Sequence, residues 1–352
     1  MPVSTHFDRN SALALFPPFV PHALLRGAHR MTVASKLPRE TNERFERLTE
    51  RRVFDVDAET RVLALVNGHP HHPHAPVLLI VHGMTGGAAS PYIRSTASKA
   101  WGLGFRTVRL NIRSCGGTEG WGPKLYHSGL TVDIRSVVHE LIERDGVREL
   151  HLGGYSLGGN MLLMTLAEWG RAVPAEVTSC VAVSPSLELA ESQRRLDEEP
   201  LLRPYRKYYL DGLKHKLRVK AHAFPGRFDV QGLESIRTLR AFDERYTAPL
   251  SGFHDADDYY AKASSGPRLP HIQVPTLLLH ARDDFVVPVD VCERPWVREH
   301  PLIEVYLTAQ GGHFGFISSR RSYGPGRADP DRFWAENRLV QYAAHAAGLP
   351  RA

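Results

Sequence analysis

The sequence predicts an α/β fold with a mostly parallel central sheet, helices on both of its faces and an inserted helical cap. Short apolar runs, typical of buried strands, alternate with helical segments through the first half of the chain and again near its end. Such alternation is typical of a parallel sheet that is covered on both faces. Between residues 186 and 270 the alternation stops, and a basic, aromatic and helical sequence replaces it.

The chain has 352 residues, of which 42% are hydrophobic, so it can bury one large core. We expect a single domain with four segments. These are an N-terminal extension with an edge hairpin (1–75), a first core segment (76–185), the cap (186–270) and a second core segment (271–352).

The expected strands are 52–56, 62–66, 77–81, 107–112, 150–152, 180–183, 276–279 and 303–307. The first two form a hairpin at the edge of the sheet. The expected helices are 41–51, 92–101, 130–142 and 161–169, followed by a closing helix that Asp329-Pro330 caps.

The net charge of +6 comes from basic residues that are scattered among 38 acidic ones, with no long basic run, so we expect no nucleic-acid partner. Three cysteines without C-x-x-C spacing predict neither a disulfide framework nor a zinc site. A reducing, cytoplasmic location fits this cysteine usage. The apolar run from Ala12 to Phe16 is too short for a signal-peptide core or a membrane span.

A turn of the pattern G-x-S-x-G, Gly154 to Gly158, joins an apolar strand to a helix that is apolar nearly all round. In such a turn the serine takes a strained backbone conformation, and the glycines let the strand and the helix pass closely. The turn would lift the Oγ of Ser156 clear of the sheet. It would also direct the amide of Leu157 along the start of the helix. The pattern predicts a nucleophile, although it also occurs by chance.

A His82-Gly83-Met84 loop follows the apolar strand 77–81. In this architecture a loop of that kind supplies one donor of an oxyanion hole. We therefore expect the backbone amides of Met84 and Leu157 to face the same point beside Ser156.

Two more polar residues follow predicted strands, namely Asp284 and His313. The chain order serine, aspartate, histidine is that of α/β-hydrolases, and we expect Ser156, Asp284 and His313 to form a catalytic triad. Asp283 is the alternative acid. Asp284 is favoured because Pro288 lies four residues after it, as in related loops.

Four histidines within residues 69–74 could bind a metal. The prolines between them prevent helical spacing and no carboxylate is near, so we expect a solvated loop. No base is evident beside Cys115, which we expect to be a packing residue. The interpretation needs no metal and no cofactor.

Several motifs resemble the YheT-like branch of α/β-hydrolases, which includes animal abhydrolase-domain lipases and yeast medium-chain ethyl-ester synthase/esterases. The resemblance extends from about Phe16 to the closing helix. The motifs that carry it are Tyr126 to Gly129, Gly154 to Leu162, Phe242 to Pro249 with Tyr259-Tyr260, and Gly311 to Phe316. The resemblance implies that Ser156 is the nucleophile, His313 the base and Asp284 the orienting acid.

Three positions depart from the family's pattern. Arg113 to Gly117 reads R-S-C-G-G where the family usually has R-G-C-S-G, and Ala28 to Thr32 reads A-H-R-M-T in place of G-H-x-Q-T. Phe285 replaces the proline that commonly follows Asp-Asp. Because the first and the third border the expected pocket, the family's substrate choice does not carry over.

These features predict a serine carboxylic-ester hydrolase for short- to medium-chain acyl or lipid-like small-molecule esters. The aromatic and leucine content of the cap suggests an acyl channel that favours medium chains. Alcohol O-acyl transfer with the same triad is one alternative. A non-catalytic membrane-surface binding protein, with the basic cap in peripheral contact with lipid, is another. The oligomeric state is left open.

Overall fold

An eight-stranded sheet forms the centre of the molecule in the computed structural model, which describes residues 14, 16–324 and 326–349. The strand order is β1-β2-β4-β3-β5-β6-β7-β8. The strands are β1 (Glu50–Asp57), β2 (Thr60–Asn67), β3 (Val77–Val81), β4 (Arg106–Leu110), β5 (Leu150–Tyr155), β6 (Val177–Val183), β7 (Thr276–Ala281) and β8 (Ile303–Thr308). β2 pairs antiparallel with β1 and β4, and the pairs from β4 to β8 are parallel. The predicted sheet and its edge hairpin are thus confirmed.

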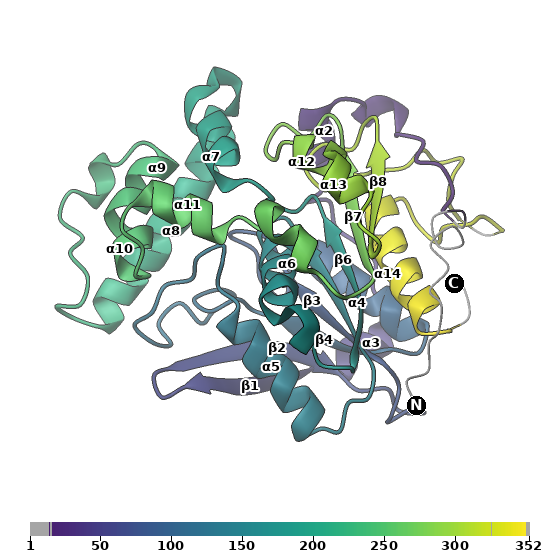
Figure 1. Ribbon diagram of the computed structural model, residues 1–352. Coiled ribbons are helices and arrows are strands. Elements are labelled where there is room, and N and C mark those ends of the chain that lie inside the picture. Colours follow the sequence, from purple (N-terminus) through teal and green to yellow (C-terminus); the bar gives the residue numbers. More distant parts are fainter. Residues whose placement is uncertain (1–13, 15, 325, 350–352) are drawn as a thin grey trace.

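Helices cover both faces of the sheet (Figure 1). One apolar cluster joins a face of the sheet to α5 (Val132–Glu143), α6 (Leu157–Trp169), α12 (Asp290–Glu293) and α13 (Pro295–Arg298). A second cluster joins the other face to α4 (Pro91–Gly102) and α14 (Trp334–Ala346). The strand β3 is buried along its whole length, which explains its continuous apolar sequence.

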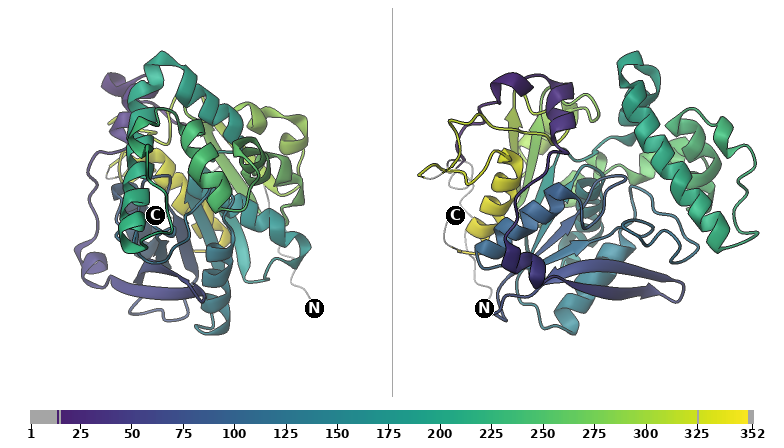
Figure 2. Two further views of the ribbon diagram at one scale, coloured as in Figure 1. Left: turned by 90° about the vertical axis from the view of Figure 1, so that its left-hand side faces the viewer. Right: turned by 180° about the vertical axis from the view of Figure 1, so that it is seen from behind.

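The cap is a helical lobe between β6 and β7 that stands to one side of the sheet (Figures 1 and 2). It contains α7 (Leu189–Glu198), α8 (Arg203–Ala223), α9 (Leu239–Phe242), the π-helix η5 (Asp243–Thr247), α10 (Ala248–Leu250) and α11 (Ala256–Ala263). Its own apolar cluster includes Leu217 and Phe242, and Val286 and Val287 join it from the loop after β7. The loop that carries Asp284 is therefore packed directly against the cap.

The N-terminal extension contains two short helices, α2 (Ala28–Ala34) and α3 (Glu43–Arg47). The expected helix 41–51 is wrong in its second half, because the chain enters β1 at Glu50 and pairs with β2. Asn42 caps α3 by accepting hydrogen bonds from the backbone N–H groups of Arg44 and Phe45. Residues 1–13 and Leu15, which include most of the apolar run from Ala12 to Phe16, lie outside the described residues.

The expected start of the closing helix, with Asp329-Pro330 at its N-terminus, is also wrong. α14 begins at Trp334, and its N-terminal flanking residue is Phe333. Asp329 lies farther back, where its buried carboxylate pairs with Arg338 of the same helix. The buried Arg338 guanidinium needs a counter-charge, which Asp329 supplies. Asp329 therefore lies along the side of the helix and not at its N-terminal end.

None of the helices in the described part of the chain is both long and apolar enough to cross a membrane.

The first turn of α6 passes so close to the end of β3 that it leaves no room for a side chain at Gly158. A Cβ there would lie 2.5 Å from the carbonyl oxygens of both Val81 and His82, which are backbone atoms that cannot turn aside. The glycine is therefore a steric requirement of the turn that carries Ser156.

Gly158→Ala should lower the free energy of unfolding by about 2 kcal/mol, because the added methyl forces the β3 and α6 backbones apart. Urea unfolding followed by circular dichroism measures this. Gly102→Ala is the matched control, since a Cβ at that helical glycine meets nothing within 4 Å, and it should be neutral or stabilising by up to about 1 kcal/mol. Equal effects of the two substitutions would contradict this account of the turn.

Candidate active site

Ser156 lies between the end of β5 and the start of α6. Its backbone has φ 53° and ψ −120°, a conformation that a non-glycine residue rarely adopts. The β5–α6 crossing maintains this conformation and presents the Oγ of Ser156 at the carboxyl edge of the sheet.

The structure brings the three residues of the predicted triad together. His313, in the loop after β8, has its Nε2 2.9 Å from the Oγ of Ser156. Its Nδ1 is 2.8 Å from Oδ2 of Asp284, which follows β7. All three side chains are buried. A hydrogen-bonded chain thus runs from the carboxylate through the imidazole to the hydroxyl.

The ionised state of Asp284 fixes the tautomer of His313. Burial would raise the pKa of Asp284, but the facing imidazoles of His313 and His280 more than offset this and hold it well below its usual range. The carboxylate is therefore ionised and accepts from the N–H at Nδ1 of His313. The Nε2 atom is left as an acceptor for the hydroxyl proton of Ser156.

Asp284 has further contacts that hold its carboxylate in place. Oδ1 accepts hydrogen bonds from the backbone N–H groups of Val286 (2.9 Å) and Val287 (3.0 Å). His280, at the end of β7, places its Nε2 3.3 Å from Oδ2 as a buried ion pair. Sequence reasoning missed His280, although its position four residues before Asp284 on the same strand end was a usable signal.

The neighbouring Asp283 binds the loop after β8 that carries His313, called here the histidine loop. Its Oδ1 accepts a hydrogen bond from the backbone N–H of Gly312 at 2.8 Å. The hydroxyl oxygen of Thr32, in α2, accepts a hydrogen bond from the backbone N–H of His313 at 2.9 Å. No local pattern indicated that Thr32 and His313, which are 281 residues apart, would meet.

The amides expected to form the oxyanion hole lie at the ends of two neighbouring strands. Leu157 is the first residue of α6, where a backbone N–H has no acceptor within the helix. Met84 follows β3, and its loop is held where the backbone N–H of Gly83 donates to the hydroxyl of Tyr92 at 3.0 Å. Burial lowers the pKa of His82 to about 4, so this buried ring is neutral and accepts from the backbone N–H of Ile112 at 3.2 Å.

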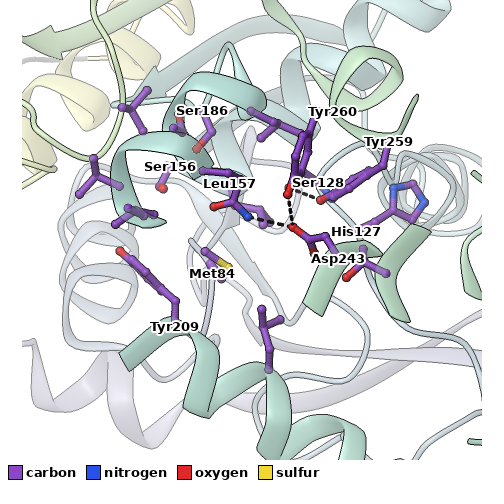
Figure 3. A pocket seen from close by; sticks show the side chains of 18 of the residues that line it. Met84, His127, Ser128, Ser156, Leu157, Ser186, Tyr209, Asp243, Tyr259 and Tyr260 are labelled. Carbon is purple, nitrogen blue, oxygen red and sulfur yellow. Dashed lines mark hydrogen bonds between the residues drawn. The ribbon is translucent and has the colours of Figure 1, made fainter. Parts of the chain in front are cut away.

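A cavity of about 50 Å³ extends from Ser156 under the cap (Figure 3). Its lining includes Met84, Leu157 and Tyr209, as well as Asp243 of the cap. Asp243 begins the π-helix η5, a helical irregularity that is frequent at functional sites.

The departure at Phe285 has a structural explanation, which involves the histidine that the N-terminal motif retains. The Phe285 ring stacks on the ring of His29, with centroids 4.2 Å apart, and lies 4.8 Å from that of Tyr205 in the cap. The hydroxyl of Tyr205 is 3.2 Å from Nδ1 of His29. The N-terminal extension, the Asp284 loop and the cap therefore meet at one aromatic cluster.

The remaining candidate residues lie apart from the triad. Cys115 is buried, with its Sγ 3.3 Å from Nζ of Lys216, and burial raises the pKa of its thiol. The His69 ring packs on Trp101 with centroids 5.3 Å apart, while the rest of the tract is exposed, so the predicted solvated loop is correct except at this first histidine. Within the described residues, no group of three or more histidine, cysteine, aspartate or glutamate side chains could hold a metal ion.

Known proteins resemble this chain in sequence and in fold. The model of the alpha/beta hydrolase fold family matches residues 76–319. The YheT esterase of Escherichia coli is 33% identical over 76% of each chain. The monoacylglycerol lipase of Saccharomyces cerevisiae is 31% identical over 70% of this chain and 56% of its own length. The phospholipase ABHD3 of Mus musculus is 30% identical over 75% of this chain and 60% of its own length. The chain thus spans less than two thirds of the last two relatives.

A solved structure, that of the 2,6-dihydroxy-pseudo-oxynicotine hydrolase, superimposes with a TM-score of 0.55, covering 84% of this chain and 68% of its own. At 16% identity this likeness shows the fold alone. The sequence matches confirm the predicted resemblance to YheT-like proteins.

Asp284→Asn should lower kcat more than Asp283→Asn, by about 10³-fold or more against wild type, because the amide favours the wrong imidazole tautomer. Asp283→Asn removes the charge but keeps an oxygen for the Gly312 N–H, and should cost about tenfold or less. Steady-state hydrolysis of a chromogenic ester compares the two variants. A larger loss for Asp283→Asn would reverse the assignment.

Proposed function

Because the chain belongs to the α/β-hydrolase family, we propose that it is a serine carboxylic-ester hydrolase that acts on short- to medium-chain acyl or lipid-like esters. The observation that carries the proposal is the continuous hydrogen-bonded chain from Asp284 through His313 to Ser156. The names of the matched esterase and lipases agree with ester hydrolysis.

In the acylation step, the Oγ of Ser156 attacks the ester carbonyl carbon while Nε2 of His313 takes the hydroxyl proton. A C–O bond forms, and the carbonyl oxygen becomes an oxyanion. The intermediate then collapses, the bond to the alcohol oxygen breaks, and the imidazolium returns its proton to that oxygen. The alcohol leaves, and Ser156 carries the acyl group as an ester.

In the deacylation step, water takes the place of the alcohol. Nε2 of His313 accepts one proton from the water as its oxygen attacks the acyl carbon, and then gives that proton to Oγ as the acyl–serine bond breaks. The products are a carboxylic acid and the free serine. Asp284 remains ionised throughout and stabilises the imidazolium that forms in each step.

The oxyanion is held by the backbone N–H groups of Leu157 and Met84 in this proposal. Where such a donor has been removed from a serine hydrolase, the barrier rises by about 3–4 kcal/mol. Both amides lie just after strands of the sheet, which hold their backbones in place. Little reorganisation of these donors is therefore needed as the negative charge develops on the carbonyl oxygen.

Ser156→Ala should lower kcat by about 10⁴-fold or more and abolish labelling by a fluorophosphonate probe, because the attacking oxygen is removed. Ser95→Ala provides a matched control, because Ser95 is a buried serine of α4 outside the triad, and this variant should keep both hydrolysis and labelling. Melting temperatures confirm that both variants fold. Full labelling of the Ser156→Ala variant, with the adduct mapped to another serine or to Cys115, would refute the proposal.

A further inference from the structure

Two cavities meet at the Ser156–His313 pair. The smaller one, of about 50 Å³, includes Ser156 and Leu157 and extends under the cap (Figure 3). The larger one is a groove of about 670 Å³ that includes His313. Met84 and Tyr209 line both cavities, so they form the boundary between them. An ester bound at the triad therefore has two different environments available for its two halves.

The chemistry of acylation decides which half of the ester lies in which cavity. Nε2 of His313 must give its proton to the alcohol oxygen as the C–O bond breaks, so the alcohol half lies on the side of the imidazole. The acyl half stays bonded to Oγ of Ser156 and extends away from the imidazole. The alcohol half is thus directed into the groove, and the acyl half into the smaller cavity.

Part of the wall of the smaller cavity is polar, beside apolar residues such as Leu196, Leu213 and Val287. Oδ2 of the buried Asp243 accepts hydrogen bonds from the hydroxyl of Tyr260 and from Nε2 of Gln193, both at 2.9 Å. The hydroxyl of Tyr259 donates to the Oγ of Ser128 at 2.9 Å. Burial raises the pKa of Asp243 to about 6 in spite of its hydrogen-bond donors, so the carboxylate is largely ionised at neutral pH.

Size and polarity together limit the acyl group that this cavity accepts. A cavity of about 150 Å³ holds benzene, so one of about 50 Å³ takes only a few heavy atoms. A longer alkyl chain would also place apolar atoms against Asp243 and the tyrosine hydroxyls without offering them a hydrogen bond. A second carboxylate would be repelled by Asp243. A short acyl group with a neutral hydroxyl meets all of these conditions.

The groove beside His313 is much larger and has more exposed apolar surface. Its walls include Val33 of α2, Leu201 and Tyr208 of the cap, and Pro91 at the start of α4. Leu201 is 77% exposed and Val33 is 62% exposed, which leaves apolar surface facing solvent on two sides of the groove. Exposed apolar surface around a groove of this size suits a long hydrocarbon group.

We infer that the substrate is an ester of a short, hydroxyl-bearing acyl group with a long-chain apolar alcohol, with Asp243 and Tyr260 as specificity-determining residues of the acyl cavity. This inference rests on the proposed ester hydrolysis. It also differs from the acyl channel expected from the sequence, because Leu201 and Tyr208 of the cap line the groove on the alcohol side.

Two substrate series test the inference in the full-length protein. With p-nitrophenol as the alcohol, kcat/KM should fall by about tenfold or more from butyrate to octanoate and be higher for 3-hydroxybutyrate than for butyrate. With acetate as the acyl group, kcat/KM should rise by about tenfold or more from ethyl to octyl alcohol. An increase from butyrate to octanoate would overturn the inference while leaving ester hydrolysis intact. If fluorophosphonate fails to label Ser156 and no ester is cleaved, the proposed function itself fails.

Paired variants separate specificity from a general structural effect. Asp243→Asn and Tyr260→Phe should each lower the ratio of kcat/KM for 3-hydroxybutyrate to that for butyrate by about fivefold, without changing the preference among alcohols. Leu201→Ser should reduce the preference for octyl over ethyl acetate and leave the hydroxyacyl ratio unchanged. Parallel losses on all substrates from the first two variants would show that Asp243 and Tyr260 act only in folding, and would overturn their assignment.

Discussion

Asp284 holds its carboxylate in the protein interior between the imidazoles of His313 and His280, and the geometry of the site follows from how this charge is compensated. Burying a carboxylate is costly unless hydrogen bonds and opposite charge accompany it. Here two backbone amides bind Oδ1, while the two imidazoles lie near Oδ2. The charge that results fixes the His313 tautomer, and this leaves Nε2 directed at Ser156 as an acceptor.

The histidine loop depends on segments that are far apart in the chain. Thr32 of α2 and Asp283 each accept a backbone hydrogen bond from this loop. The His29–Phe285–Tyr205 cluster joins the same N-terminal extension to the Asp284 loop and to the cap. The position of His313 is therefore coupled to the packing of the extension and the cap.

The elements with strong local patterns could be predicted from the sequence. The apolar strand Val77–Val81 and the G-x-S-x-G turn appear where they were expected, because continuous burial and close backbone approach restrict the residues allowed there. Features that depend on tertiary contacts could not be predicted. Asp329 has a sequence typical of a helix cap but pairs with Arg338, and the second half of the expected helix 41–51 is a strand because β2 lies beside it. Thr32 contacts His313 without any local signal.

Ester hydrolysis through the triad requires a covalent acyl group at Ser156, so trapping that intermediate tests the proposed mechanism most directly. Wild-type protein would be mixed with a short-chain p-nitrophenyl ester, quenched in acid within milliseconds, digested and analysed by mass spectrometry. We expect a burst of nitrophenol equal to the enzyme concentration, and the acyl mass on the peptide that contains Ser156. An acyl group on a different residue, or turnover with neither a burst nor a labelled peptide under conditions where deacylation limits the rate, would contradict the account.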